Sequence, residues 1–562
     1  MVIVVATMYV DSSTVRGKKG QQYTRHLLRE SFREGGKVRH RTIANLSRCS
    51  PEEVLAIKLA LKHKKNLTEL VAVDEALSLS QGPSVGAVSV LHATAKKLGI
   101  TAALGHTRQG KLALWQIFAR IINQGSRLSA VRLARRHAAC DLLGLDSFNE
   151  DDLYANLNWL CENQTKIEDR CYRAMNSGKK TGSGLFLYDV TSTYLEGKHH
   201  ELGAFGYNRD KKEGKRQIVI GLLCDDAGRP ISIEVFPGNT SDTKTFSQQL
   251  QKVAGRFGAD EVTFVGDRGM IKGPQIEEIS SREGFHYISA LTRPQIETLL
   301  NSGVIQLGLF DETLAEILSY EKERLILRRN PYRKLEIEES RKDRLRTLRE
   351  AIVKYNRYLE EHPRALVAVG LRRMREKAEK LRISTWIRIE AQDREIISIV
   401  DQATLDEVSK LDGCYVLRTD LDPGQASKET IHARYKDLAM VEHAFRSTKS
   451  GHLEMRPLFL RNSSRTRGYA LVVMLAYRII QELADRWTSF DLTVEEAIGQ
   501  LSTLCAIAVS VNGKPAYHQI PTPPPEIQQL IDAVGISLPT HFKNSGTHVS
   551  TRVKIGKDRV KR

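Results

Sequence analysis

The chain is 562 residues long, 41% of them hydrophobic, and its 85 Lys and Arg residues outnumber its 67 Asp and Glu, giving a formal net charge of +18. Several domains and a polyanionic partner, most commonly nucleic acid, are therefore expected, although charge alone also allows ribosomal or membrane-surface binding. Seven scattered cysteines without a Cys-x-x-Cys pair argue against a disulfide framework or a zinc knuckle, and the longest later apolar run, residues 470–477, is too short to span a membrane.

Residues 1–50 have the pattern of a small basic module. Weak alternation, with glycine breaks at 17–20 and 35–36, predicts two or three short strands. The apolar stretch at 1–6 lacks the basic region and cleavage site of a signal peptide. The strands could form a solvated edge sheet or contact DNA through the cations Arg25, Arg29, Arg33, Lys37, Arg39 and Arg41.

Residues 51–180 have helical periodicity. Ser50 and Pro51 suit the N-cap and first position of a helix. Amphipathic segments follow at 85–97, 110–122, 129–137 and 151–175, and residues 176–184 have the composition of a linker. The third segment carries Arg132, Arg135 and Arg136 on one side, as in a helix that lies in the DNA major groove. An ordinary exposed basic helix would have the same composition.

From residue 184 the pattern changes to strands. The first, 185–191, carries Asp189 and is followed by a polar loop in which Asp210 belongs to a surface charge cluster. Strands at 217–224 and 230–236, a helix through Phe246, a strand ending at Asp267, a helix near Pro274 and a strand at 285–291 follow. Three antiparallel strands and then helix, strand, helix, strand is the connectivity of an RNase-H-like α/β domain.

Residues 297–410 interrupt this plan with charged helices at 332–358 and 365–381 and short strands at 384–390 and 395–400. This insertion could be a coiled-coil spacer or a contact with DNA ends. The sheet resumes at 413–419, and an apolar helix at 468–487 covers it. The end of the chain is Pro-rich and then basic, and its last twelve residues are expected to be disordered.

These elements predict a multidomain α/β protein built around an RNase-H-like mixed sheet with flanking helices. The catalytic domain comprises residues 181–296 plus 411–512, and a mainly helical insertion subdomain, 297–410, interrupts it. A small basic β-rich module, 1–50, and a helical DNA-binding region, 51–180, precede it, and residues 513–562 form a C-terminal tail.

Three carboxylates are the candidate catalytic residues. On a helix over 435–449, Tyr435, Glu442 and Lys449 share one face, where a charge must be paired or bind a metal. An ordinary i,i+4 pair of Glu442 with Arg446 is the alternative. Together with Asp189 and Asp267 on strands, Glu442 would supply the hard oxygen ligands of Mg²⁺ in a site that cuts nucleic acid.

Residues 188–191, 237–243, 266–270 and the helix at 435–449 together resemble DDE transposases of bacterial insertion sequences, in the insertion-sequence-four superfamily. The likeness covers about 180–490. The family's Y-(2)-R-(3)-E-(6)-K pattern is met by Tyr435, Glu442 and Lys449, but Leu438 stands where arginine is usual. Arg434 or Arg446 could compensate for that arginine.

The resemblance implies that Asp189, Asp267 and Glu442 bind two Mg²⁺ ions, for which Mn²⁺ could substitute, and that water and then a freed 3′-hydroxyl attack phosphodiester bonds. Tyr435, Lys449, Arg446 and Arg268 would contact the transposon end. It also implies double-stranded DNA partners, both transposon ends and target, a homodimer in a synaptic complex, cut-and-paste transfer through a hairpin intermediate, and a bacterial cytoplasmic, nucleoid-associated protein without a membrane partner.

Two other functions remain open from the sequence. A stand-alone nuclease of the same fold would cut without joining, and a catalytically inactive or domesticated sequence-specific DNA-binding protein would only bind. The large flanking regions argue against the first, and the presence of all three carboxylates argues against the second.

Overall fold

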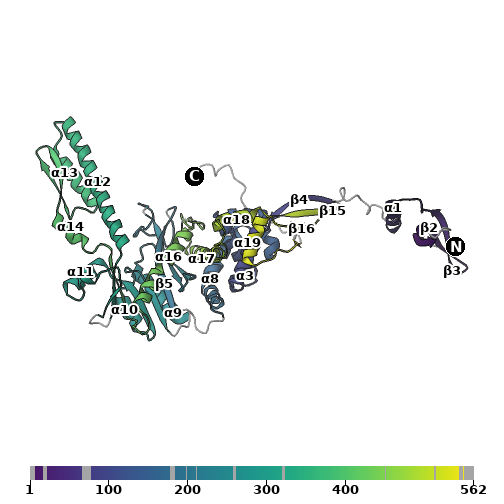
Figure 1. Cartoon of the computed structure of the whole chain (residues 1–562), viewed down its shortest axis with the longest axis horizontal. Helices are drawn as coiled ribbons and strands as arrows, with labels where there is room; N and C mark the ends of the chain where they lie inside the picture. The colour runs from purple at the N-terminus through teal and green to yellow at the C-terminus, as the bar shows by residue number, and fades with distance from the viewer. Residues whose placement is uncertain are drawn as a thin grey trace. The chain divides into compact units, whose positions relative to one another are not determined.

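A computed structural model describes residues 7–16, 22–65, 77–177, 184–197, 199–210, 212–256, 261–318, 323–449, 451–511, 514–542 and 549. The chain forms two compact units. One comprises Met1–Gly82, Ala506–Pro521 and Thr540–Asn544, and the other comprises the remaining residues. The elements are drawn in Figure 1.

The first unit begins with an antiparallel sheet of β1 (Thr7–Arg16), β2 (Gln22–Glu34) and β3 (Lys37–Asn45), which confirms the strands predicted for the N-terminal module. Helix α1 (Pro51–Lys62) contacts β1 and starts with a capping box, in which the Ser50 side chain accepts from Glu53 N–H and the Glu53 side chain accepts from Ser50 N–H. A second sheet has the order β17 (His541–Phe542), β16 (Lys514–Gln519), β15 (Cys505–Val511), β4 (Leu77–Ser84).

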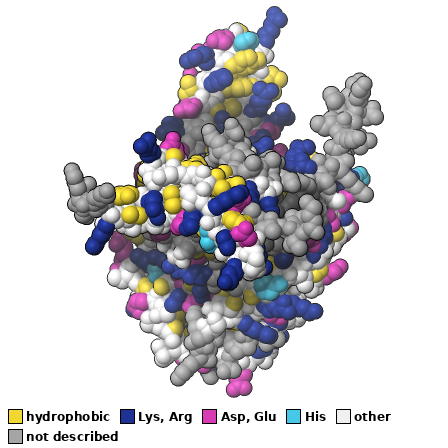
Figure 2. All heavy atoms as spheres, turned by 90° about the vertical axis from the view of Figure 1, so that its right-hand side faces the viewer, with side chains coloured by type: hydrophobic (Ala, Val, Ile, Leu, Met, Phe, Trp, Pro, Cys, Tyr) yellow, Lys and Arg dark blue, Asp and Glu magenta, His cyan; other side chains and the backbone are white. Residues whose placement is uncertain are grey.

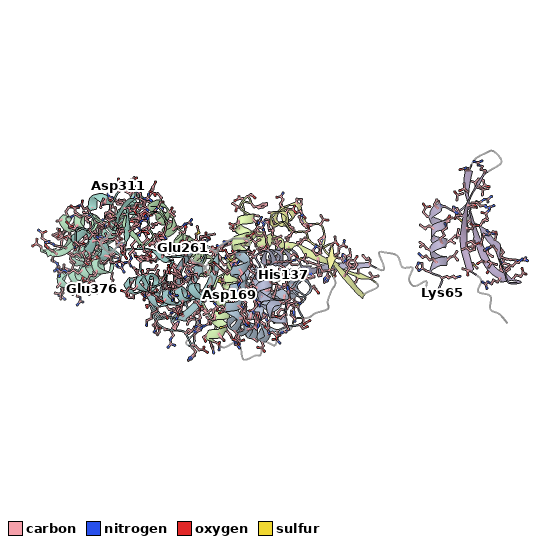
Figure 3. All side chains as sticks on the ribbon, turned by 90° about the horizontal axis from the view of Figure 1, so that it is seen from below. Lys65, His137, Asp169, Glu261, Asp311 and Glu376 are labelled. Atoms are coloured by element: carbon pink, nitrogen blue, oxygen red, sulfur yellow. The ribbon has the colours of Figure 1, made fainter. Side chains whose placement is uncertain are left out.

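The second unit starts with a helical part that confirms the four predicted helices. These are α3 (Gly86–Lys97), α5 (Arg108–Ile122), α6 (Arg127–Arg136) and α8 (Glu150–Met175), accompanied by the short α4 (Ile100–Leu104) and α7 (Ala139–Leu143). The apolar helix α17 (Ser463–Arg486) packs against both α8 and α5. His137 and Asp169 are labelled in this part in Figure 3. None of the described helices is long and apolar enough to cross a bilayer.

The main sheet has eight strands in the order β10 (Ala315–Leu318), β11 (Arg324–Arg329), β14 (Cys414–Thr419), β9 (Phe285–Ala290), β8 (Val262–Gly266), β5 (Leu185–Tyr194), β6 (Gln217–Cys224), β7 (Pro230–Pro237). Strands β5, β8 and β9 are parallel, and the other pairs are antiparallel. With α9 (Asp242–Arg256) and α10 (Gly273–Ser280), the chain follows the predicted order of strands and helices. The protein is therefore of mixed α/β class.

The core under this sheet is aromatic. Phe186, Tyr188, Phe246 and Phe264 are fully buried, and the Phe246 and Phe264 rings meet edge to face at 5.4 Å between centroids. All eight residues of β6 are buried. The sheet is therefore covered on both faces around β5, the strand that carries Asp189.

The residues between β9 and β14 differ in part from the predicted insertion. Helices α12 (Pro331–Glu361) and α13 (Val367–Lys380) lie side by side (Figure 1) and share a core with the hairpin of β12 (Ile387–Gln392) and β13 (Glu395–Val400). Helices α11 (Arg293–Asn301), η2 (Leu307–Leu309) and α14 (Gln402–Ser409) complete the segment. However, β10 and β11 extend the main sheet. A run of four to six residues is too short for its period to distinguish strand from helix.

The C-terminal residues also contain ordered elements that the sequence did not predict. Within 513–562, β16 joins a sheet, and helix α19 (Pro525–Val534) accepts a hydrogen bond from the Trp487 indole N–H at the Leu530 carbonyl (3.0 Å). Helix α18 (Val494–Thr503) contacts α19 as well. Residues 178–183 of the linker predicted at 176–184, and the last twelve residues, lie outside the described part of the chain.

Candidate active site

Two aspartates lie at the same level of the sheet. Strands β5 and β8 are parallel, with Tyr188 opposite Gly266, so Asp189 and Asp267 occupy the next position on each. Neighbouring strands are about 4.8 Å apart. Asp189 is half-buried and its Oδ1 accepts from Val190 N–H (2.7 Å), while Asp267 is exposed and accepts from Arg268 N–H (2.8 Å).

The third carboxylate comes from a helix that differs from the predicted one. The sequence predicts one helix over 435–449, whereas the structure has α15 (Lys428–Lys436) and α16 (Leu438–Lys449), separated at Asp437. Aspartate is disfavoured in helix interiors because its side chain forms hydrogen bonds with nearby groups of the chain. Here the Asp437 side chain accepts a hydrogen bond from Arg434 Nη1 at 3.1 Å. Glu442 is exposed on α16, which packs against β5.

Tyr435 is the residue that connects these elements. It lies at the end of α15, is half-buried, and its hydroxyl is 3.5 Å from Asp267 Oδ1. Burial raises the pKa of Tyr435, and the Asp267 charge raises it further, so the phenol stays protonated. A neutral hydroxyl donor therefore faces one of the two aspartates.

Charge repulsion couples the three carboxylates. Burial raises the pKa of Asp189 to about 7, and the negative charges of Asp267 and Glu442 raise it as well. The Val190 N–H and the Arg209 guanidinium act in the opposite direction. A cation among these groups would relieve that repulsion.

The donor chemistry suits Mg²⁺ or Mn²⁺, because all three groups present carboxylate oxygens. Asp189 lies on β5, Asp267 directly follows β8, and Glu442 lies on an exposed helical face. Within the described ranges, no three His, Cys, Asp or Glu residues lie close enough together to hold one ion. The residues therefore fit a divalent metal by type, although the three carboxylates are not close enough together to form a closed site.

Lys449, predicted to contact DNA, is buried. Its Nζ is 2.7 Å from Asp210 Oδ1 and donates to Thr191 Oγ1 on β5 (2.9 Å). Arg456 pairs with the same Asp210 oxygen at 2.6 Å. The sequence places Asp210 in a surface cluster, and this is wrong, because its side chain is 1% exposed and neutralises two cations. Lys449 thus fixes the end of α16 to β5.

Arg209 is a site residue that the sequence did not reveal. It donates two hydrogen bonds of 2.8 Å to Asp242, the first residue of α9, and its charge reaches Asp189. The sequence motif at 237–243 does not indicate a partner for Asp242. A distant Arg–Asp pair across a loop leaves no periodic signal by which it could be found.

The same loop between β5 and β6 exposes aromatic rings beside cations. Tyr207 and Phe205 are 82% and 64% exposed. The Arg209 guanidinium lies 5.6 Å from the Tyr207 ring centre, and that of Arg216 lies 5.6 Å from the Phe205 ring centre. Exposed aromatic and basic side chains together are the usual composition of a nucleic-acid surface.

The remaining predicted DNA contacts are surface cations. Arg268 is exposed beside Asp267, and Arg446 is exposed on α16. Arg132, Arg135 and Arg136 are exposed on α6, where Arg135 donates to the Val549 carbonyl at 2.9 Å. Lys and Arg side chains also recur across the face in Figure 2, interspersed with acidic ones.

Leu438, in the position where the family pattern has arginine, is half-buried at the first residue of α16. Of the two cations that could replace that arginine, Arg434 is paired with Asp437 (3.1 Å). Arg446 is on the exposed side of α16, one turn beyond Glu442.

Comparison with known proteins gives two family matches. A model described as a transposase DDE domain matches residues 180–479, and one described as the IS1634 family transposase N-terminal domain matches residues 11–74. Neither description names the insertion-sequence-four superfamily, so that placement stays a prediction. No curated protein matches the chain.

One solved structure, a piggyBac transposase synaptic complex with hairpin DNA, aligns with 70% of this chain and 69% of its own. The identity is 10% and the TM-score is 0.35, a likeness too weak to establish a common fold.

Proposed function

Because the chain belongs to the DDE transposase family of insertion sequences, we propose that it binds the terminal inverted repeats of its element and performs metal-dependent strand cleavage and transfer. The observation that carries the proposal is the position of Asp189 and Asp267 at one level of parallel strands, with Glu442 near enough to raise the pKa of Asp189. The strand order around them supports an RNase-H-like catalytic domain.

We propose Asp189, Asp267 and Glu442 as the residues that would hold Mg²⁺. When bound, such ions would activate the attacking oxygen and stabilise the leaving one. The chain's own side chains would position the DNA. Tyr435 donates a hydroxyl proton beside Asp267, Arg268 offers a guanidinium at the same turn, and Lys449 holds α16 against β5.

DNA would extend over several parts of the chain. The loop rings Phe205 and Tyr207, with their paired arginines, would contact the transposon end near the carboxylates. Arg446 would contact a phosphate on the exposed side of α16, and the cations of α6 and of the N-terminal module would contact DNA further away. Two copies holding two ends and a target duplex would form the synaptic complex, acting on nucleoid DNA in the bacterial cytoplasm.

The test is cleavage of a labelled inverted repeat with Mg²⁺. Asp189→Ala and Glu442→Ala should bind the end normally yet lose nicking by at least about a hundredfold, since each removes a proposed metal ligand. Asp226→Ala, in the turn between β6 and β7, is the matched control and should nick as the wild type does.

If either variant nicks normally, these residues are not the metal ligands. Wild-type products separate the three functions: joined products indicate a transposase, cut products alone indicate a nuclease, and binding alone indicates an inactive descendant. Short inverted repeats should flank the coding sequence.

A further inference from the structure

A pocket of about 300 Å³ lies in the second unit, apart from the three carboxylates. It is lined by the start of α6, by residues of α5, α8 and α17, and by the segment 454–460. Its volume is at the lower end of the range, about 300–1,000 Å³, of sites that bind small molecules.

One wall of this pocket is cationic. Arg127 and Arg120 are 8% and 4% exposed, and neither forms an ion pair with any described carboxylate. Their guanidinium carbons lie 5.1 and 5.4 Å from the centre of the Tyr469 ring. A buried cation normally requires a paired anion, so the two arginines make this pocket a candidate site for an anionic group.

The two arginines have different roles. Arg120 donates to the backbone carbonyls of Leu453, Gln124 and Gly125, and to that of Glu454, so it holds the segment after α16 against α5. Among the described residues Arg127 donates to Gln116 Oε1 at 2.7 Å, which leaves most of its five N–H donors for a ligand. Burial lowers the pKa of Arg127, and the Arg120 charge lowers it further.

Another wall of the pocket is apolar. It consists of Met455, Pro457, Leu458, Phe459 and Leu460, and Phe459 is 72% exposed. Glu454 is the acidic residue among those that line the pocket, and its carbonyl accepts from Arg120. A ligand with an anionic group and a flat apolar ring would match both walls.

We propose that this pocket binds a nucleotide, with the phosphate on Arg127 and the base or sugar against the apolar wall at Phe459. The origin of this nucleotide rests on the proposed function. If the chain acts on DNA, the nucleotide is the phosphorylated terminus of a DNA strand; otherwise it is a free nucleotide. Arg456 also lines the pocket and pairs with Asp210, which pairs with Lys449 on α16. A phosphate here would therefore compete with Asp210 for Arg456, one ion pair away from the helix of Glu442.

The test measures binding of dAMP, deoxyadenosine and inorganic phosphate to the full chain by calorimetry, without Mg²⁺. Wild type should bind dAMP at least about tenfold more tightly than deoxyadenosine, and Arg127→Met should weaken dAMP and phosphate by about tenfold or more. Phe459→Ala should weaken dAMP and leave phosphate unchanged. Lys166→Met, which removes an exposed cation of α8, should alter neither.

Equal dAMP binding by wild type, Arg127→Met and Phe459→Ala would overturn the proposal, as would no dAMP binding by the wild type. Phe459 is exposed, so its variant reports on the pocket even if Arg127→Met unfolds, and Arg127→Lys, which keeps the charge, should lie between wild type and Arg127→Met. If a 5′-phosphorylated duplex displaces dAMP better than its unphosphorylated counterpart, the site takes a DNA terminus; if neither does, it takes a free nucleotide.

Failure of this proposal is distinguishable from failure of the transposase function. Asp189→Ala should bind dAMP as the wild type does, because Asp189 does not line the pocket. A wild type that binds dAMP but never nicks DNA would contradict only the catalytic proposal. A wild type that nicks DNA but does not bind dAMP would contradict only the proposal that the pocket binds a nucleotide.

Discussion

His137 is a buried titratable side chain whose environment disfavours its charge. It follows α6 and is labelled in Figure 3. It is 7% exposed, and its Nδ1 has no hydrogen-bond partner among the described residues. Burial lowers its pKa to about 4, and the neighbouring Arg136 contributes to the shift. Because the unfolded chain binds a proton near pH 6.5, the folded state loses stability as the pH falls from about 6.5 to about 4.

The expected loss from His137 is on the order of 3 kcal/mol over that interval. Urea unfolding of the wild type and of His137→Gln at pH 7 and at about pH 4.5 measures it. The glutamine variant does not titrate, so its stability should fall less with pH. The same fall in stability in both proteins would show that the pKa of His137 is not lowered in the folded state.

Lys449 and Asp210 show why part of the site could not be predicted from the sequence. The pattern predicts Lys449 as a contact with DNA, but a lysine that contacts DNA and a lysine that pairs internally have the same spacing. Asp210 beside Lys211 and Lys212 has the composition of a surface cluster. Only the packing of the β5–β6 loop against α16 brings Asp210 to Lys449.

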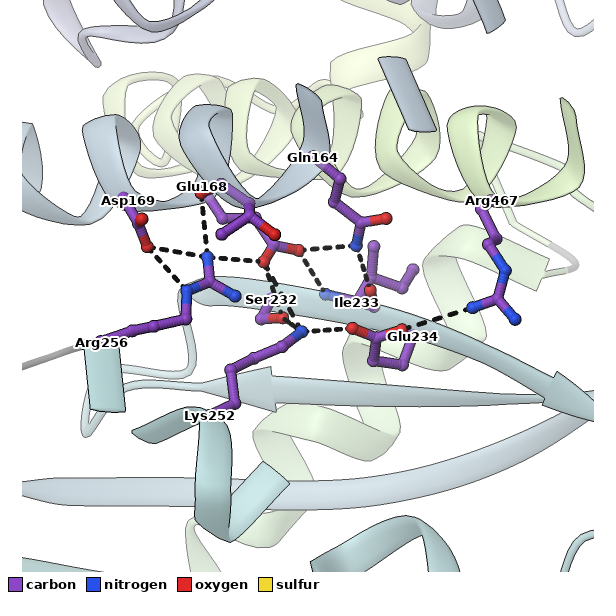
Figure 4. A network of polar contacts seen from close by, with 10 residues as sticks. Gln164, Glu168, Asp169, Ser232, Ile233, Glu234, Lys252, Arg256 and Arg467 are labelled. Atoms are coloured by element: carbon purple, nitrogen blue, oxygen red, sulfur yellow. Dashed lines mark hydrogen bonds and ion pairs between the residues drawn. The ribbon is translucent and has the colours of Figure 1, made fainter. Parts of the chain in front are cut away.

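At the scale of elements, a polar network joins α8 to β7 and α9 (Figure 4). The Glu168 side chain is fully buried on α8 and accepts from Ser232 Oγ (3.0 Å) and from Ile233 N–H (3.2 Å). Arg256 Nη2 lies 3.2 Å and Lys252 Nζ 3.6 Å from the same carboxylate. These bonds fix the helical part of the unit against the sheet.

Glu168→Ala should lower the free energy of unfolding by about 3 kcal/mol or more, because it leaves buried donors and cations without their acceptor. Glu168→Gln keeps the shape and should cost less. Glu162→Ala, at an exposed position of the same helix, is the control and should change stability by less than about 0.5 kcal/mol. Comparable losses from Glu162→Ala and Glu168→Ala in urea unfolding would contradict this role of the network.

Two helical glycines have opposite requirements. A Cβ at Gly468 would lie 2.0 Å from the Leu157 carbonyl oxygen, where α17 crosses α8, whereas one at Gly499 on α18 would meet nothing within 4 Å. Gly468→Ala should therefore destabilise the protein by about 1–3 kcal/mol through overpacking. Gly499→Ala should stabilise it by roughly 0.5–1 kcal/mol through helix propensity. Thermal unfolding measures both, and a neutral Gly468→Ala would mean that the helices can separate at no cost.

Elements with a clear period could be predicted from the sequence, and others could not. Helices α3, α5, α6 and α8 and the strands β5 to β9 have apolar patterns long enough to identify. Strands β10 and β11 are short, and the break at Asp437 depends on one residue that a helical stripe tolerates. The motif therefore predicts a candidate site, while the division of its helix required the structure.

At the scale of the whole molecule, a charge of +18 attracts any polyanion, so net charge cannot identify the residues that contact DNA. The salt dependence of binding can identify these residues, because each phosphate contact on a duplex contributes about 0.9 to the slope of log K against log salt concentration. Arg132 is exposed on α6, whereas Arg135 on the same helix donates to the Val549 carbonyl. Arg132 is thus the better probe of this helix.

We expect Arg132→Gln to weaken binding to a duplex equally for all sequences and to reduce the salt slope by about one, as loss of one phosphate contact requires. Lys166→Gln removes the same charge from an exposed position of α8 and should leave the slope unchanged, which separates a contact from an effect of net charge. Fluorescence anisotropy titrations at several salt concentrations measure both slopes. If Arg132→Gln weakens binding to the inverted repeat alone, with an unchanged slope, the residue contacts a base and α6 reads the sequence. If neither slope nor affinity changes, α6 lies outside the DNA interface, and the cations near the carboxylates must supply the contacts.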